Sequence, residues 1–284
     1  MLGPRLTVST MNKTLLAAIK FFCMLSLAWC AGLAAPCYAQ ATTGRPVATE
    51  QTLVASLDTA DEEQRLTLLL ELSALFKARL SATRPNTIAA LTKLLQSDAA
   101  PIIRTHAARA LELAGDASAI DALLAAFKTE REMTTRKTIL YALARYSAPQ
   151  VTSALLPLLN HKEQEIRATA AYVLAEQSDT AAAKPLLELL QKRRKDTDVF
   201  ARSQAVRGLG RIGYQAATNV LIETLQKDEA QIVRREAATA LGWLTTLPAP
   251  NVLAALRTAS QADDPYLREA ALAAIAKINA RESF

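Results

Sequence analysis

The chain repeats a segment of its own sequence, and this repetition limits the folds open to it more than any other feature. The stretch DEAQIVRREAATALGWL at residues 228–244 closely resembles SDAAPIIRTHAARALEL at residues 97–113. Both stretches place an arginine three residues ahead of a pair of apolar residues. Self-similarity at a period of about 20 to 50 residues is typical of solenoids and other repeat architectures.

Equivalent arginines recur through the chain at spacings of 31 to 35 residues. We call them the anchor arginines: Arg104, Arg136, Arg167, Arg202, Arg234 and Arg268. The residues three, four and seven positions beyond each anchor are apolar, which is the spacing of one helix face. A second apolar pair recurs nineteen and twenty positions beyond the anchor, except after the last one. Each unit is therefore predicted to contain two helices.

Short breakers separate these helices, among them Gly115-Asp116, Ser178-Asp179 and Pro248-Ala249-Pro250. Turns this short favour antiparallel hairpins, and a lone hairpin buries its apolar faces only by stacking on its neighbours. Aromatic residues make up only 5% of the chain, so few side chains typical of strands are present. We predict an all-α solenoid of about six helix pairs and a C-terminal capping helix over residues 58–280. The expected units lie near residues 61–96, 97–128, 129–160, 161–191, 192–226 and 227–260, with the cap at 261–280.

Residues 1–39 have the three-part pattern of a secretory signal peptide. Arg5, Lys13 and Lys20 precede an uncharged apolar run at residues 21–35, and small residues follow in PCYAQAT. This run of 15 residues is shorter than the roughly 20 of a membrane-spanning helix. We predict cleavage near Gln40 or Thr42, no stable membrane insertion afterwards, and a flexible linker at 40–57. The alternative is an uncleaved leader that anchors the chain to the inner membrane.

The same leader contains all three cysteines, Cys23, Cys30 and Cys37, so the exported form is expected to have no disulfide. Loss of residues 1–39 also removes three positive charges and no negative ones, which lowers the net charge from +6 to +3. A balance this close to neutral argues against nucleic acid as a partner.

The stretch SDAAPIIRTHAARALELAGDASAIDALLAAF at residues 97–127 resembles the HEAT repeat of the type named after phycobilisome (PBS) lyases. The resemblance implies a right-handed superhelix with the anchor-bearing first helices on the convex side and the second helices on the concave side. It also implies a structural ladder of ion pairs between adjacent units. Its members are the six anchor arginines and the acidic residues six positions ahead of four of them, Asp98, Glu130, Asp196 and Asp228.

Enzymatic activity and cofactors are not expected from these residues. The related fold of deoxyhypusine hydroxylase holds iron with repeated His-Glu pairs, and this chain has only His106 and His161, neither followed by Glu. The GLGRIG segment at residues 208–213 closes a helix and follows no strand, so close packing and a helix cap explain it better than phosphate binding. Stacked helical surfaces typically bind proteins or peptides. The sequence therefore predicts a non-enzymatic interaction scaffold in the periplasm, or secreted, with a maturation factor or lyase-like enzyme as the alternative.

Three surfaces are candidates for binding a protein or peptide partner. The favoured one is a polar row on the second helices, which the resemblance places in the concave groove: Asn160, Lys184, Gln191, Asn219, Gln226 and Asn251. Side-chain amides donate and accept hydrogen bonds at once, which suits a peptide backbone. The second is the basic loop with Lys192, Arg193, Arg194 and Lys195. The third lies five and nine positions beyond the anchors and includes Tyr141, Tyr172 and Trp243, with the alternative that Trp243 covers the turn at 248–250.

Overall fold

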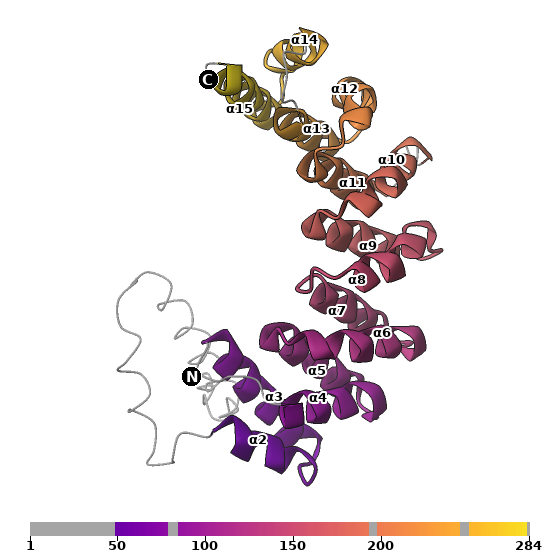
Figure 1. Ribbon diagram of the computed structural model, residues 1–284, viewed down its shortest axis with the longest axis vertical. Helices are drawn as coiled ribbons and strands as arrows, with labels where there is room; N and C mark the ends of the chain where they lie inside the picture. The colour runs from indigo at the N-terminus through magenta and orange to yellow at the C-terminus, as the bar shows by residue number, and fades with distance from the viewer. Residues whose placement is uncertain (1–48, 79–84, 193–197, 245–249, 283–284) are drawn as a thin grey trace, which may run out of the picture. The chain divides into compact units, whose positions relative to one another are not determined.

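The computed structural model describes residues 49–78, 85–192, 198–244 and 250–282, and within these ranges it contains α-helices, short 3-10 turns and no strand. The expected all-α solenoid is confirmed (Figure 1). The α-helices are α2 (Glu50–Leu57), α3 (Glu62–Lys77), α4 (Pro85–Ser97), α5 (Pro101–Ala114), α6 (Ile120–Thr129), α7 (Met133–Leu143), α8 (Pro149–Leu155), α9 (Gln164–Gln177), α10 (Ala183–Lys192), α11 (Val199–Ile212), α12 (Thr218–Lys227), α13 (Gln231–Leu244), α14 (Pro250–Ala259) and α15 (Pro265–Glu282).

The chain begins its stack earlier than the sequence indicated. The proposed signal peptide lies outside the described residues, but the end of the expected linker at 40–57 is helical, because α2 covers Glu50–Leu57 and buries Leu53 and Leu57. Correspondingly, Glu62–Lys77 and Pro85–Ser97 form the first helices after it. None of the described helices is both long and apolar enough to cross a membrane.

Each even-numbered helix packs mainly against the odd-numbered helix that follows it. The hairpins are therefore α2 with α3, α4 with α5, and so on to α14 with α15, which makes seven pairs within the described residues. The sequence units group each anchor helix with the helix after it, whereas the packing of the described helices brings each anchor helix closest to the helix before it, so that α15 packs on α14. A repeating pattern gives the period of a solenoid, but the start of a unit depends on which helices pack together.

Local sequence explains where the helices begin and end. The carboxylate of Asp198 accepts a hydrogen bond from the backbone N–H of Ala201 and caps the start of α11. Gly213 ends the same helix with φ of 75°, a left-handed conformation that glycine adopts without steric cost. Pro101, Pro149, Pro250 and Pro265 each occupy the first turn of a helix, where the missing N–H costs no hydrogen bond.

The core follows the predicted apolar positions. Three, four and seven residues beyond the anchors of α5 to α13, every side chain is buried. In α15 this pattern weakens, because Ala271 is buried whereas Leu272 is 56% exposed. Along the even-numbered helices α6 to α12, the first residue of each apolar pair is more deeply buried than the second. Leu123 and Leu186 are examples.

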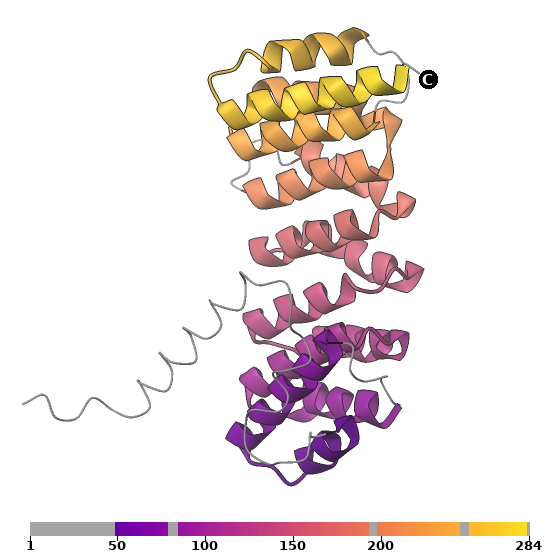
Figure 2. The same ribbon diagram turned by 90° about the vertical axis from the view of Figure 1, so that its left-hand side faces the viewer.

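The two kinds of helix form two rows within the stack Glu50–Glu282 (Figures 1 and 2). The odd-numbered helices, which include all the anchors, lie on the inner side of its curve and form what we call the inner row. The even-numbered helices form the outer row. The expectation that second helices line the concave side is therefore wrong, and the concave side belongs to the anchor helices.

Small residues explain this curvature. A Cβ placed on Gly210 of α11 would stand 2.7 Å from the Cα of Ala240 in α13, and one on Gly242 would stand 2.8 Å from the Cα of Ala274 in α15. Such contacts let the backbones of successive inner helices approach closely, whereas the outer helices bury larger side chains such as Leu186 and Leu221. A stack whose one row is more closely spaced curves toward that row.

Candidate interaction surface

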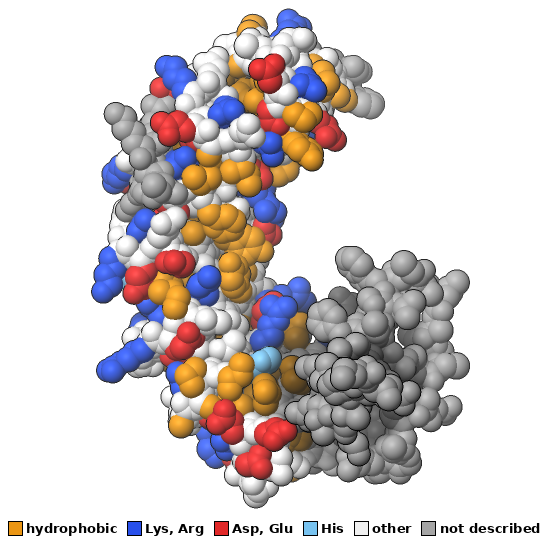
Figure 3. Space-filling view, turned by 180° about the vertical axis from the view of Figure 1, so that it is seen from behind, with side chains coloured by type: hydrophobic (Ala, Val, Ile, Leu, Met, Phe, Trp, Pro, Cys, Tyr) orange, Lys and Arg blue, Asp and Glu red, His pale blue; other side chains and the backbone are white. Residues whose placement is uncertain are grey.

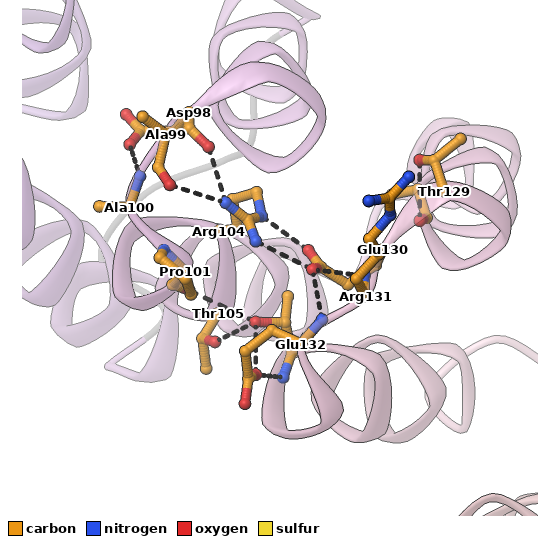
Figure 4. A network of polar contacts seen from close by, with 12 residues as sticks. Asp98, Ala99, Ala100, Pro101, Arg104, Thr105, Thr129, Glu130, Arg131 and Glu132 are labelled. Atoms are coloured by element: carbon orange, nitrogen blue, oxygen red, sulfur yellow. Dashed lines mark hydrogen bonds and ion pairs between the residues drawn. The ribbon is translucent and has the colours of Figure 1, made fainter.

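The anchor arginines form ion pairs between neighbouring units (Figure 4). The guanidinium of Arg104 donates to both carboxylate oxygens of Glu130, at 2.6 and 2.9 Å, and also to the backbone carbonyls of Asp98 and Ala99. Glu130 accepts two further hydrogen bonds from backbone N–H groups. The Arg104 guanidinium, together with these N–H groups, lowers the pKa of Glu130 despite its partial burial.

The same joint recurs along the stack, with each acid paired to the arginine of the preceding unit. Arg202 and Asp228 meet through two contacts of 3.0 Å and are 3% and 4% exposed. The other pairs in this series are Arg65 with Asp98, Arg136 with Glu163, and Arg167 with Asp198.

Three expected members of the ladder differ from the pattern. Asp196 lies outside the described residues, and Asp198 provides the acid at that joint. At the last joint Arg235 takes the place of Arg234 and pairs with Asp264. The guanidinium of Arg234 instead donates to the carbonyls of Asp228 and Glu229, and Arg268 makes the equivalent contacts with Ala262 and Asp263. The ladder is thus a set of joints that hold successive helix pairs together.

A second set of side chains on the inner helices lies five and nine positions beyond the anchors. Tyr141 of α7 and Tyr172 of α9 make an edge-to-face contact with their ring centroids 5.5 Å apart. Both are only partly buried. They occupy the same position in successive repeats, so the contact crosses from one unit to the next.

Charged side chains continue this surface on α9 and α11. The carboxylate of Glu176 contacts Arg207 at 2.9 Å and Arg211 at 3.0 Å, and all three side chains are about a quarter to a third exposed. Arg211 also donates to the hydroxyl of Ser178 and the carbonyl of Glu176, at the end of α9. A cation at this place interacts favourably with the negative end of the helix dipole.

Trp243 of α13 and Lys277 of α15 extend the surface toward the C-terminal end. The ammonium group of Lys277 lies 5.6 Å from the centroid of the Trp243 ring. Trp243 packs beside Gly210, since a Cβ on that glycine would stand 3.2 Å from the indole. The alternative that Trp243 covers the turn at 248–250 involves residues outside the described ranges, apart from Pro250.

Two polar groups on α11 and α13 are buried without enough hydrogen bonds or opposite charge to offset the cost of burial. Burial raises the pKa of Glu236 on α13, an effect that the charge of Arg207 partly offsets. On α11 the carbonyl oxygen of the Gln204 side chain is buried and has no hydrogen-bond partner. Each such group lowers the stability of the fold.

The favoured polar row lies on the outer row of helices, away from this surface. Its six members, Asn160, Lys184, Gln191, Asn219, Gln226 and Asn251, are all exposed. Gln226 and Thr258 line a cleft of about 730 Å³ between the ends of α12 and α14. In the basic loop, Lys192 pairs with Glu188 at 3.3 Å, and Arg193, Arg194 and Lys195 lie outside the described residues.

One feature of the inner helices escaped the sequence reasoning. Exposed apolar side chains recur two positions before the anchor: Ile102, Phe200, Ile232 and Tyr266. Their exposed fractions run from 44% to 63%. Figure 3 views the stack from the side on which the inner helices begin, and hydrophobic side chains recur there among charged ones. The sequence contains this pattern as an apolar residue two positions before these anchors, outside the positions that form the core.

The described residues contain no group of three or more His, Cys, Asp and Glu side chains that could hold a metal ion. Burial lowers the pKa of His106 on α5. His161 lies in the turn before α9, where its Nδ1 accepts a hydrogen bond from the backbone N–H of Glu163. The two imidazoles belong to different helix pairs and form no shared site.

Comparisons with known proteins agree with this geometry. Models of HEAT repeats match residues 132–199 and 189–276, and the PBS lyase HEAT-like repeat matches residues 103–129. A search of curated proteins gives no match.

Solved structures of similar fold include the complex of CpcE and CpcF of phycocyanin lyase from Nostoc sp. PCC7120, with 20% identity over 84% of this chain and 79% of that chain and a TM-score of 0.45. Human deoxyhypusine hydroxylase in complex with glycerol has 20% identity over 81% and 84% of the two chains and a TM-score of 0.40. A designed armadillo repeat protein in complex with the peptide (KR)4 has 17% identity over 82% and 100%, with a TM-score of 0.43. These likenesses concern the fold alone. The HEAT-repeat matches span more than half of the chain, which therefore belongs to the HEAT-repeat family.

Proposed function

We propose that this protein is a non-enzymatic scaffold that binds a protein partner along its inner row. The observation that carries the proposal is the set of partly exposed Tyr, Arg and Trp side chains on successive inner helices, held in place by contacts between repeats. These residue types dominate the energetics of protein interfaces. Side chains already held in one conformation also lose less entropy on binding.

We further propose that the protein acts in the periplasm after removal of residues 1–39. The support is the order of basic, apolar and small residues in the leader, together with the restriction of cysteine to that leader. Fractionation of the native cells and N-terminal sequencing check this. The proposal requires a periplasmic chain that begins near Gln40 or Thr42, and a cytoplasmic chain that retains Met1 or Met11 would refute it.

Site-specific photocrosslinking in the native cells tests the binding side. A photoreactive amino acid replaces Tyr172 on the inner row, and in a matched control it replaces Asn219, an exposed residue on the outer row. We expect a discrete adduct from position 172 and none from position 219. An adduct from position 219 alone would transfer the binding site to the outer row.

The competing function, a lyase-like or maturation enzyme, predicts a different composition of the purified protein. Metal analysis and an absorption spectrum distinguish the two. Stoichiometric iron or a bound pigment would overturn the scaffold proposal.

A further inference from the structure

The inner row has an uneven charge along one side. Five and nine residues beyond the anchors, α5 to α15 carry five cationic side chains and one acidic one. The cations are Arg109, Arg145, Arg207, Arg211 and Lys277, and the acid is Glu176. Tyr141, Tyr172 and Trp243 occupy three of the remaining positions. Aromatic rings therefore alternate with positive charges along the row.

Neighbouring groups neutralise these cations only in part. Arg109 pairs with Glu112 on its own helix, at 2.8 Å. Arg207 and Arg211 contact the same Glu176 carboxylate, and the other acid that interacts with Arg207 is the partly buried Glu236 on α13. Arg145 is exposed. Because a guanidinium has five N–H donors, Arg207 and Arg211 keep donors available to a bound carboxylate.

The outer row differs in its aromatic content rather than in the sign of its charge. The described residues of α4 to α14 in this row contain more cations than acids, namely Lys93, Lys128, Lys184, Lys192, Lys227 and Arg257 against Asp121, Glu188 and Glu223. Its exposed charges include the pairs Lys192 with Glu188 and Lys227 with Glu223, in which each cation has its own acid one turn away. Apart from Phe127, which lies under the guanidinium of Arg136, the described parts of α4 to α14 in this row contain no aromatic residue. Several partly exposed aromatic rings beside cations are thus the feature that distinguishes the inner row.

We infer that the partner bound along the inner row presents an extended acidic segment that also contains apolar or aromatic side chains. This inference rests on the proposed function and adds the chemistry of the partner. Carboxylates form short, charge-assisted hydrogen bonds with guanidinium groups, and apolar side chains between them pack on Tyr141, Tyr172 and Trp243. Neighbouring packed helices lie about 9 Å apart, so the row from α7 to α15 matches an extended segment of about 11 residues.

Fluorescence anisotropy with synthetic peptides tests the charge of the partner. The probe is a labelled peptide of about 16 residues in which Glu-Glu-Tyr-Gly repeats. The comparison probes are the same peptide with Lys in place of Glu and an oligothymidylate of about 16 nucleotides, since aromatic rings beside cations also suit single-stranded nucleic acid. We expect the acidic peptide to bind most tightly, with a Kd that rises about tenfold between about 50 and 300 mM salt.

Matched variants locate the contact. The double substitution Arg207→Gln and Arg211→Gln should weaken binding of the acidic peptide at least about fivefold. The control, Lys184→Gln with Arg257→Gln, removes the same charge from the outer row. It should leave the Kd within about twofold. Circular-dichroism melts check that both variants fold. If the first variant does not fold, Arg145→Gln replaces it, because this arginine is exposed beyond the end of α7.

Several outcomes would overturn the inference. They are tighter binding of the basic peptide or the oligonucleotide, no binding of any probe, or equal losses in the inner and outer variants. The photocrosslinking result separates this failure from failure of the scaffold function. An adduct at position 172 with a partner that has no acidic segment would leave the scaffold standing and remove only the charge assignment.

Discussion

At the scale of single residues, one arginine can perform two tasks at a joint. The guanidinium of Arg104 holds the carbonyls of the loop before its own helix and the carboxylate of the next unit. Only arginine provides enough donors in a fixed geometry for both tasks. The acid must in turn lie in the following loop, which accounts for the recurrence of both residue types.

The most deeply buried joint is the most informative to break. Asp228→Ala removes the carboxylate that makes two contacts with the guanidinium of Arg202, 3% exposed, and should lower the free energy of unfolding by about 3 kcal/mol. Chemical denaturation measures the loss. Glu188→Ala, which breaks an exposed pair with Lys192, serves as the comparison and should cost about 1 kcal/mol or less. Equal losses would show that burial of the joint has no special effect.

Glu236 predicts a stability that depends on pH. Burial raises the pKa of its carboxyl in the folded protein, so the folded state binds the proton more tightly than the unfolded state. Stability therefore falls as pH rises through the interval between the unfolded and folded pKa values. Glu236→Gln should raise the melting temperature at pH of about 7, and the advantage should shrink as pH falls toward the unfolded pKa of about 4.3 and be absent below it. An advantage that grows in acid would contradict this assignment.

At the scale of helices, close contacts between small residues set the spacing of the inner row. Gly208 faces Ala175, Gly210 faces Ala240, and Gly242 faces Ala274, so each of these three interfaces joins a glycine to an alanine. The ion pairs then add contacts near the starts of the same helices. A larger residue at position 210 or 242 would have to shift the neighbouring helix, because its Cβ would meet the backbone Cα of Ala240 or Ala274 at 2.7 or 2.8 Å.

Two glycine substitutions test this. Gly210→Ala brings a Cβ to 2.7 Å from the Cα of Ala240 and should cost about 1 to 3 kcal/mol despite the better helix propensity of alanine. Gly208→Ala meets first the flexible end of Leu186, at 2.8 Å, and should cost less. Thermal melts of the two variants provide the measurement. A greater loss at position 208 would mean that the α11 to α13 spacing is adjustable.

At the scale of the whole stack, the row of a helix decides whether its exposed residues belong to the concave or the convex surface. Tyr141, Tyr172 and Trp243 were assigned to the convex side by resemblance and lie on the inner row instead. The amide-rich row was assigned to the groove and lies on the outer helices.

This placement changes the result expected from the two surfaces. Replacing Asn160, Gln191, Asn219 and Gln226 with alanine should leave binding of the acidic peptide within about twofold of the unmodified protein. Tyr172→Ala should weaken the same binding by about 1 kcal/mol, which is about fivefold, because it removes a ring from the inner surface. Both results come from the anisotropy titration. Loss of binding in the amide variant would return the site to the outer row.

The sequence alone determined the repeating helices from α3 onward, most of their buried positions, and four of the joint arginines, Arg104, Arg136, Arg167 and Arg202. These depend on periodicity and on short breakers, which act over a few residues and are legible without a fold. It did not determine which helices pair, which arginine serves the last joint, or which row is concave. Those outcomes depend on contacts between residues far apart in the sequence, such as Gly210 with Ala240 and Arg235 with Asp264. Curvature arises from the difference in spacing between two rows, and that difference exists only once both rows are packed.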